Sequence, residues 1–283
     1  MEIRADPEDR PHHLRRETRS RALPLVIAVL FAAAAAGAVY WWFVRDRGSP
    51  APSRPPEASA RPAPKGEPPA ATRFPIPGAE TGKSLPTLDM SDSLAREEIA
   101  GLVGSKAFAD LVVPTGIVRR FVATVDNLPR SAAPRRVFPV HSVPGVFGVT
   151  GRGESLAIGP VNPARYAMHV RVLESADATA LVKTYLRLYP LFQRAYEELG
   201  FPGRHFNDRL VEAMDDLLAA PDAAPSVRLL QPKVLYVFAD PDLEARSAGQ
   251  KILVRMGGDN AARVKAKLRE IRRHLVAASG GKP

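Results

Sequence analysis

One short segment of the chain, RHFNDR (Arg204–Arg209), contains side chains suited to general acid–base catalysis: His205, Asp208 and Arg209. Catalysis would require the imidazole and the carboxylate to lie within hydrogen-bond reach of one substrate. The alternative interpretation is structural. Asn207 caps a helix, Asp208 sits near the positive end of its dipole, and Arg209 is solvated. We favour the structural interpretation and keep these three residues as candidate catalytic residues.

A second candidate site lies in the last predicted helix, where basic side chains surround an apolar stripe. Lys265, Arg269 and Arg273 form one row at i,i+4 spacing, and like charges at this spacing repel by about 0.2–0.5 kcal/mol per pair. An anionic partner would offset that repulsion, although cations near a helix C-terminus also complement its dipole. Arg119 and Arg120 belong to another basic cluster, and the sequence leaves open whether the two clusters meet. The candidate anion-binding residues are Lys265, Arg269, Arg272, Arg273, Arg119 and Arg120.

Other kinds of chemistry lack the residues they need. The chain has no Cys, which excludes disulfides, Cys-ligated metal centres and a thiol nucleophile. The segment PGAETGKSL has one residue too few between its glycines for a phosphate-binding loop, and two prolines precede it. Asp240, Asp242 and Glu244 alternate as in a calcium loop, but Ala245 occupies the glycine position, so we expect a helix cap instead. We predict no metal and no cofactor.

These candidate residues must be positioned by the elements of a chain of 283 residues with a formal net charge of +10. Residues 23–44 (LPLVIAVLFAAAAAGAVYWWFV) carry no charge. As a helix they would be about 33 Å long, enough to cross a hydrocarbon core of about 30 Å. We expect a single-pass membrane anchor, with a cleaved signal peptide or a buried helix as alternatives.

The flanks of this apolar segment predict its orientation. Positions 8–22 hold five Lys/Arg and positions 45–59 hold three, so the positive-inside rule favours a cytoplasmic N-terminus. Residues 48–84 hold ten of the 28 prolines and one aromatic residue, which predicts a disordered linker. The predicted segments are a cytoplasmic tail (1–22), the transmembrane helix (23–44), the linker (45–84), a globular domain (85–278) and a short tail (279–283).

Apolar periodicity and cap residues predict a mainly α fold for the globular domain, a compact helical bundle with a minor β-hairpin. Two stretches are less regular: 130–160 is rich in Pro and Gly, and 227–238 reads as one strand or two. The predicted helices begin near Ser91, Pro114, Pro163, Asp177, Pro190, Asn207, Asp240 and Gly258.

Several blocks of this domain resemble the bacterial domain-of-unknown-function family numbered 3014, whose members are uncharacterised single-pass membrane proteins. The blocks are Arg119–Arg130, Tyr189–Pro202, Phe206–Pro221, Gln231–Gly257 and Asn260–Arg272. The resemblance implies the same order of membrane helix, Pro-rich spacer and domain. It implies no activity and no site residues.

We therefore expect an inner-membrane protein of the bacterial envelope whose C-terminal domain lies outside the cytoplasm and serves interaction or scaffolding, without catalysis. The bilayer is the expected partner of residues 23–44, together with another envelope protein or an anionic polymer. Nucleic acid is not expected, because the aromatic residues occupy core spacing and form no stacking pattern. The alternatives are an envelope hydrolase acting on wall or lipid material, and a module that binds anionic polymer or lipid headgroups.

Overall fold

The computed structural model describes residues 72–77, 85–222, 224 and 226–280. Over these residues the domain is mainly helical, as the sequence predicts, with nine α-helices and two small antiparallel sheets. No helix among them is both long and apolar enough to cross a bilayer. The segment 23–44 lies outside the described residues. The helices are α2 (Asp92–Val103), α3 (Ser105–Leu111), α4 (Ile117–Asn127), α5 (Asn162–Ser175), α6 (Ala178–Glu198), α7 (Phe206–Leu218), α8 (Pro241–Glu244), α9 (Ala248–Arg255) and α10 (Gly258–Ala278).

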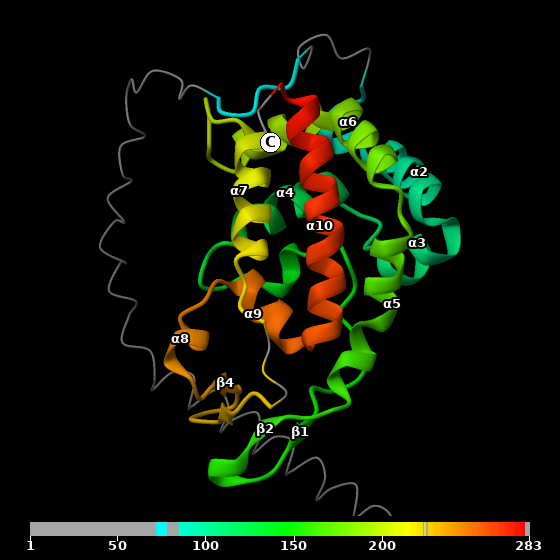
Figure 1. Cartoon of the computed structure of the whole chain (residues 1–283). Coiled ribbons are helices and arrows are strands. Elements are labelled where there is room, and N and C mark those ends of the chain that lie inside the picture. The colour runs from blue at the N-terminus through cyan, green and yellow to red at the C-terminus, as the bar shows by residue number, and fades with distance from the viewer. Residues whose placement is uncertain (1–71, 78–84, 223, 225, 281–283) are drawn as a thin grey trace, which may run out of the picture. The chain divides into compact units, whose positions relative to one another are not determined.

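The main core lies between α4, α6, α7 and α10, which pack against one another in Figure 1. Phe206, at the first position of α7, is fully buried. Its ring lies within about 6 Å of the rings of Phe121, Phe192 and Tyr196, centroid to centroid. Aromatic rings bury large apolar areas and prefer such offset and edge contacts, so this cluster ties α4 and α6 to the start of α7.

The helices differ from the predicted ones in three ways. The helix predicted to start at Pro190 is the second half of α6, which runs through this proline. Pro190 lacks an N–H donor, at a cost of about 3 kcal/mol, but Tyr189 and Leu191 on either side are buried in the core. The helix predicted from Asp240 is two helices, because the Ser247 side chain accepts a hydrogen bond from the Gln250 N–H and starts α9. Helix α3 had no predicted counterpart.

The sequence predicts one hairpin, and the described residues contain two. β1 (Val149–Thr150) pairs with β2 (Ala157–Ile158), and β3 (Leu229–Leu230) pairs with β4 (Val237–Phe238). The two hairpins are joined, because Leu229 N donates to Leu156 O (2.8 Å) and Ile158 N donates to Val227 O (2.9 Å). We call residues 144–161 and 226–239 the hairpin end. It lies at the lower end of Figure 1, beside the start of α10.

A fully buried asparagine, Asn162, attaches the first hairpin to the helices. Its amide nitrogen donates to Gly148 O (2.6 Å) and Gly159 O (2.8 Å), and its oxygen accepts from Gly148 N (3.1 Å). Arg165, one turn further along α5, donates to Pro144 O (2.9 Å) and Gly145 O (3.0 Å). The backbone of 144–148 is therefore held by side chains of α5.

The close approach of the two chain segments here requires glycine. A Cβ on Gly159 would lie 3.0 Å from Gly148 C and 3.2 Å from Val149 C, both backbone atoms. We predict that Gly159→Ala lowers the free energy of unfolding by about 1–3 kcal/mol, because overpacking forces the backbone to move. The measurement is urea unfolding of the full chain in detergent, followed by circular dichroism.

Gly101→Ala is the matched control for this substitution. Gly101 lies inside α2, and an added Cβ there meets nothing within 4 Å. Alanine is the better helix former by about 1 kcal/mol, so the control is expected to stabilise. Equal effects of the two substitutions would contradict the close-approach account.

Candidate functional site

The start of α7 holds the three candidate acid–base residues, and its capping differs from the prediction. His205 is the N-cap residue, but its side chain makes no capping hydrogen bond. The Phe206 N–H is instead satisfied by Gln193 Oε1 of α6, at 2.8 Å. The prediction that Asn207 caps this helix is wrong, because Asn207 is already inside the helix and its side chain points into the core.

Asn207 is fully buried and joins three other elements. Its oxygen accepts from the Tyr185 hydroxyl of α6 (3.1 Å). Its nitrogen donates to Phe74 O (2.8 Å) and to Ser279 Oγ, just after α10 (3.1 Å). A buried amide must be hydrogen-bonded to avoid a penalty of about 1–3 kcal/mol, so these contacts fix the relative positions of the elements.

Asp208 holds the segment 72–77. Its two carboxylate oxygens accept from Phe74 N (2.8 Å), Arg73 N (3.0 Å) and Thr72 Oγ1 (3.3 Å). These residues belong to the stretch that composition assigns to the linker, yet Phe74 and Ile76 pack against the core. A few backbone hydrogen bonds and two apolar side chains are enough to order six residues, and average composition does not report such a contact.

Arg209 faces a different partner from Asp208. Its Nε lies 3.2 Å from Asp126 Oδ1 of α4, its Nη2 donates to Asp126 O (2.6 Å), and its Nη1 pairs with Glu212 Oε1 (2.8 Å). Asp126 is buried and also pairs with Arg130 (2.7 Å). Arg209 is thus largely shielded from water in an ion-pair network around the buried Asp126, so the prediction that it is solvated is wrong.

His205 borders a surface depression that it shares with Tyr189, Gln193 and Glu197. Burial raises the pKa of Tyr189 to about 12, so its hydroxyl stays protonated and donates to Gln193 Oε1 (2.9 Å). Neither Asp208 nor Arg209 lines this depression. The structure therefore places the three candidate acid–base residues on one helix start but directs them to separate neighbours.

Most of the candidate anion-binding residues have protein partners. Lys265 is buried and donates to Ala220 O (2.6 Å) and Asp222 Oδ1 (2.9 Å), and this hydrogen bond lowers the pKa of Asp222. Arg272 pairs with Asp215 at 2.6 Å. Both acids lie on or just after α7, so these two cations fasten α10 to the α7 region.

The second basic cluster is also paired. Arg119 bridges Asp89 (2.8 Å) and Glu198 (3.1 Å). Arg120 donates to Thr115 O (2.9 Å) and to Arg136 O. Arg269 and Arg273 are exposed and have no ion-pair or hydrogen-bond partner within the part of the chain that the structure describes. Only these two of the six candidate cations present a charge without a protein partner.

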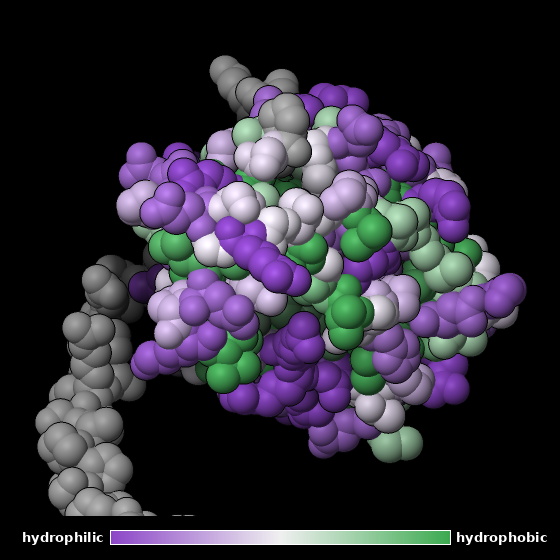
Figure 2. Space-filling view, turned by 90° about the horizontal axis from the view of Figure 1, so that it is seen from below, coloured by the Kyte–Doolittle hydropathy of each residue, from purple (hydrophilic) through white to green (hydrophobic). Residues whose placement is uncertain are grey.

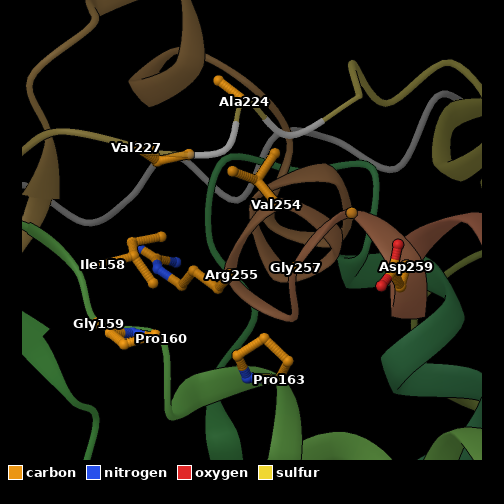
Figure 3. A pocket seen from close by; sticks show the side chains of 11 residues that line it. Ile158, Gly159, Pro160, Pro163, Ala224, Val227, Val254, Arg255, Gly257 and Asp259 are labelled. Atoms are coloured by element: carbon orange, nitrogen blue, oxygen red, sulfur yellow. The ribbon is translucent and has the colours of Figure 1, made fainter.

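A hollow of about 350 Å³ lies beside the hairpin end, lined by Gly159, Val227, Arg255 and Asp259 among others. Figure 3 shows Arg255 extending toward Ile158, with Asp259 on the other side of the hollow. The Arg255 guanidinium lies 4.8 Å from the centroid of the Phe238 ring, and burial lowers its pKa. It has no ion pair or hydrogen bond within the described residues, so the hollow contains a cation that an anionic group can approach.

The hairpin end also exposes large apolar side chains. Val146 is 88% exposed, Val234 85% and Leu235 77%. Figure 2 views the molecule from this end and shows hydrophobic side chains set among hydrophilic ones. The sequence also indicates this surface. Pro232 and Lys233 mark a turn, where polar residues are expected, but the next two residues are the apolar Val234 and Leu235. The apolar pattern of 227–238 predicts strands and does not distinguish the exposed turn from them.

The chain belongs to the family described as proteins of unknown function (DUF3014), which matches residues 117–272. The matched residues run from the start of α4 into α10 and include both hairpins, Asn162, Asn207 and Arg255. Comparisons with curated proteins and with solved structures find no match.

The contacts of Asp208 predict a proteolysis phenotype. Asp208→Ala removes the acceptor for the Arg73 and Phe74 N–H groups, so the segment 72–77 should detach more often. We expect trypsin to cleave after Arg73 about tenfold faster or more, since each lost hydrogen bond is worth about 1 kcal/mol. Mass spectrometry of timed digests of the full chain measures this rate.

Asp215→Ala is the control, because Asp215 lies on the same helix and pairs only with Arg272 among the described residues. It should leave cleavage after Arg73 unchanged. A normal cleavage rate in Asp208→Ala would show that Asp208 is not what holds the segment.

Proposed function

We propose that this chain is a single-pass membrane protein of the bacterial envelope whose helical domain is an interaction or scaffold module outside the cytoplasm. In this proposal residues 23–44 anchor the chain in the inner membrane with the N-terminus in the cytoplasm, and the Pro-rich stretch that follows is a spacer. The 22 uncharged residues, the aromatic residues at one end of them and the basic bias of the flanks support the anchor.

The observation that carries the interaction role is the exposure of Val146, Val234 and Leu235 on a well-held backbone. Single exposed apolar residues are common on protein surfaces, but large ones that project from joined hairpins favour a binding role. A partner that covers these side chains removes apolar surface from water, and this favours association.

One alternative function has an observation in its favour. The hollow with Arg255 supports binding of an anionic polymer or lipid headgroup, since this partly buried guanidinium stacks on Phe238 but has no ion pair among the described residues and gains from pairing with a carboxylate or phosphate. The hydrolase alternative has no comparable support, because Asp208 and Arg209 already bind the segment 72–77 and Asp126.

The topology in this proposal is testable with a reporter enzyme fused after Pro283. A reporter that is active only after export should be active, and a reporter that is active only in the cytoplasm should be inactive. Deletion of residues 23–44 should reverse both results. Activity of the cytoplasmic reporter on the intact chain would contradict the proposed topology.

A further inference from the structure

We propose that the hairpin end docks on the surface of the same membrane that anchors the chain. The exposed apolar side chains enter the boundary between headgroups and acyl chains, and nearby basic side chains contact anionic lipid headgroups. This inference rests on the proposed function, because the anchor supplies the membrane.

The first support is the kind of side chain that projects from the hairpins. Val146 stands on the loop before β1, and Val234 and Leu235 stand in the turn between β3 and β4. The two loops are neighbours, because the Phe147 and Tyr236 rings lie 6.0 Å apart, centroid to centroid. Side chains at the tips of loops can enter a bilayer interface without unfolding the sheet behind them.

The second support is that these tips are held in place. Asn162 and Arg165 hydrogen-bond the backbone on both sides of Val146. The turn with Val234 is closed by β3 and β4, and Ala239 N also donates to Arg228 O (3.0 Å). Apolar side chains on a fixed backbone lose little conformational freedom on docking. The loss of conformational entropy therefore reduces the binding free energy only slightly.

The third support is charge. In the hairpin end, Arg152 and Glu154 of 144–161 offset each other, which leaves the charges of Arg228 and Lys233 in 226–239. Both basic side chains are exposed and have no ion-pair partner among the described residues. A basic, apolar loop is complementary to a bilayer with anionic headgroups, where each Lys or Arg near the surface adds to binding. A protein partner is the other occupant to consider, and the experiment below separates the two.

The fourth support is the length of chain between the anchor and the domain. The chain enters the domain at 72–77, which Asn207 joins to the end of α10, whereas the hairpin end lies beside the start of α10. For the hairpins to face the bilayer, the tether must span at least the length of α10, whose 21 residues measure about 31 Å.

The 27 residues at 45–71 can span this distance. They reach about 85 Å as an extended Pro-rich chain and about 30 Å as a flexible coil. A tether of this length also keeps the domain close to the bilayer, so docking is an intramolecular event and a weak interfacial affinity is enough.

The experiment uses the full chain, which has no native Cys and only two Trp, Trp41 and Trp42, both in the predicted anchor. Val234→Cys is labelled with an environment-sensitive fluorophore, and the protein is placed in vesicles of phosphatidylcholine with or without 30% phosphatidylglycerol. Lipids with a nitroxide on the acyl chain quench fluorophores that lie in the bilayer. Met90→Cys is the control site, since Met90 is 70% exposed on a 3₁₀ helix that packs against α6.

Docking predicts at least twofold stronger quenching of the label at 234 than at 90 in anionic vesicles, and weaker quenching at 234 in neutral vesicles or high salt. Quenching of Trp41 and Trp42 reports the anchor independently. If the tryptophans are quenched and the label at 234 is no more quenched than the label at 90, the docking proposal is overturned. A protein would then be the occupant of the hairpin end to test next. Unquenched tryptophans would overturn the anchor and, with it, this proposal.

A shorter tether prevents the hairpin end from reaching the bilayer without altering the domain. Deletion of residues 48–69 leaves five residues between 44 and 72, which reach at most about 18 Å when fully extended. Quenching at 234 should fall to the level of the label at 90, while the tryptophans remain quenched. Unchanged quenching at 234 would overturn the docking geometry.

Discussion

A buried asparagine amide must find its hydrogen-bond partners inside the protein, and this requirement fixes both ends of the domain. Asn207 is fully buried where the entering segment, α6 and the end of α10 meet, and bonds with each of them. Asn162 is fully buried at the other end and holds the backbone of the first hairpin. Each amide has hydrogen bonds in several directions, so the elements around it cannot shift independently. The helices between them supply the apolar core.

The packing of these elements explains why most of the candidate catalytic and anion-binding residues bind other parts of the protein. A helix start is rich in polar residues because free N–H groups and the dipole favour them, and the same residue types serve catalysis. At the start of α7 these side chains point in different directions, so each binds a different neighbour. Asp208 binds the entering segment, and Arg209 pairs with the buried Asp126. Lys265 and Arg272 of α10 likewise pair with acids of the α7 region. Among the described residues, Arg269 and Arg273 keep free charges, and the hairpin end keeps its exposed apolar tips and basic side chains.

The sequence was informative where local rules decide the structure. The Asp177 and Asp240 side chains cap α6 and α8, and α2 begins at Asp92 where the apolar periodicity begins, so the mainly helical class followed from local signals. It failed where distant packing overrides a local rule: α6 continues through Pro190 because both sides are buried. It also failed where partners lie far away in sequence. The contact of Asp208 with Phe74 spans 134 residues, and neither that contact nor the joining of the two hairpins is visible in periodicity.

Hydrogen–deuterium exchange of the full chain in vesicles measures whether the hairpin end lies against the lipid surface, as we propose. The peptides that cover 144–149 and 231–236 should exchange several-fold more slowly in anionic vesicles than in neutral ones, because docking excludes water from these tips. Peptides from α2 should exchange equally in both. Equal exchange of the hairpin peptides in the two kinds of vesicle would contradict the claim.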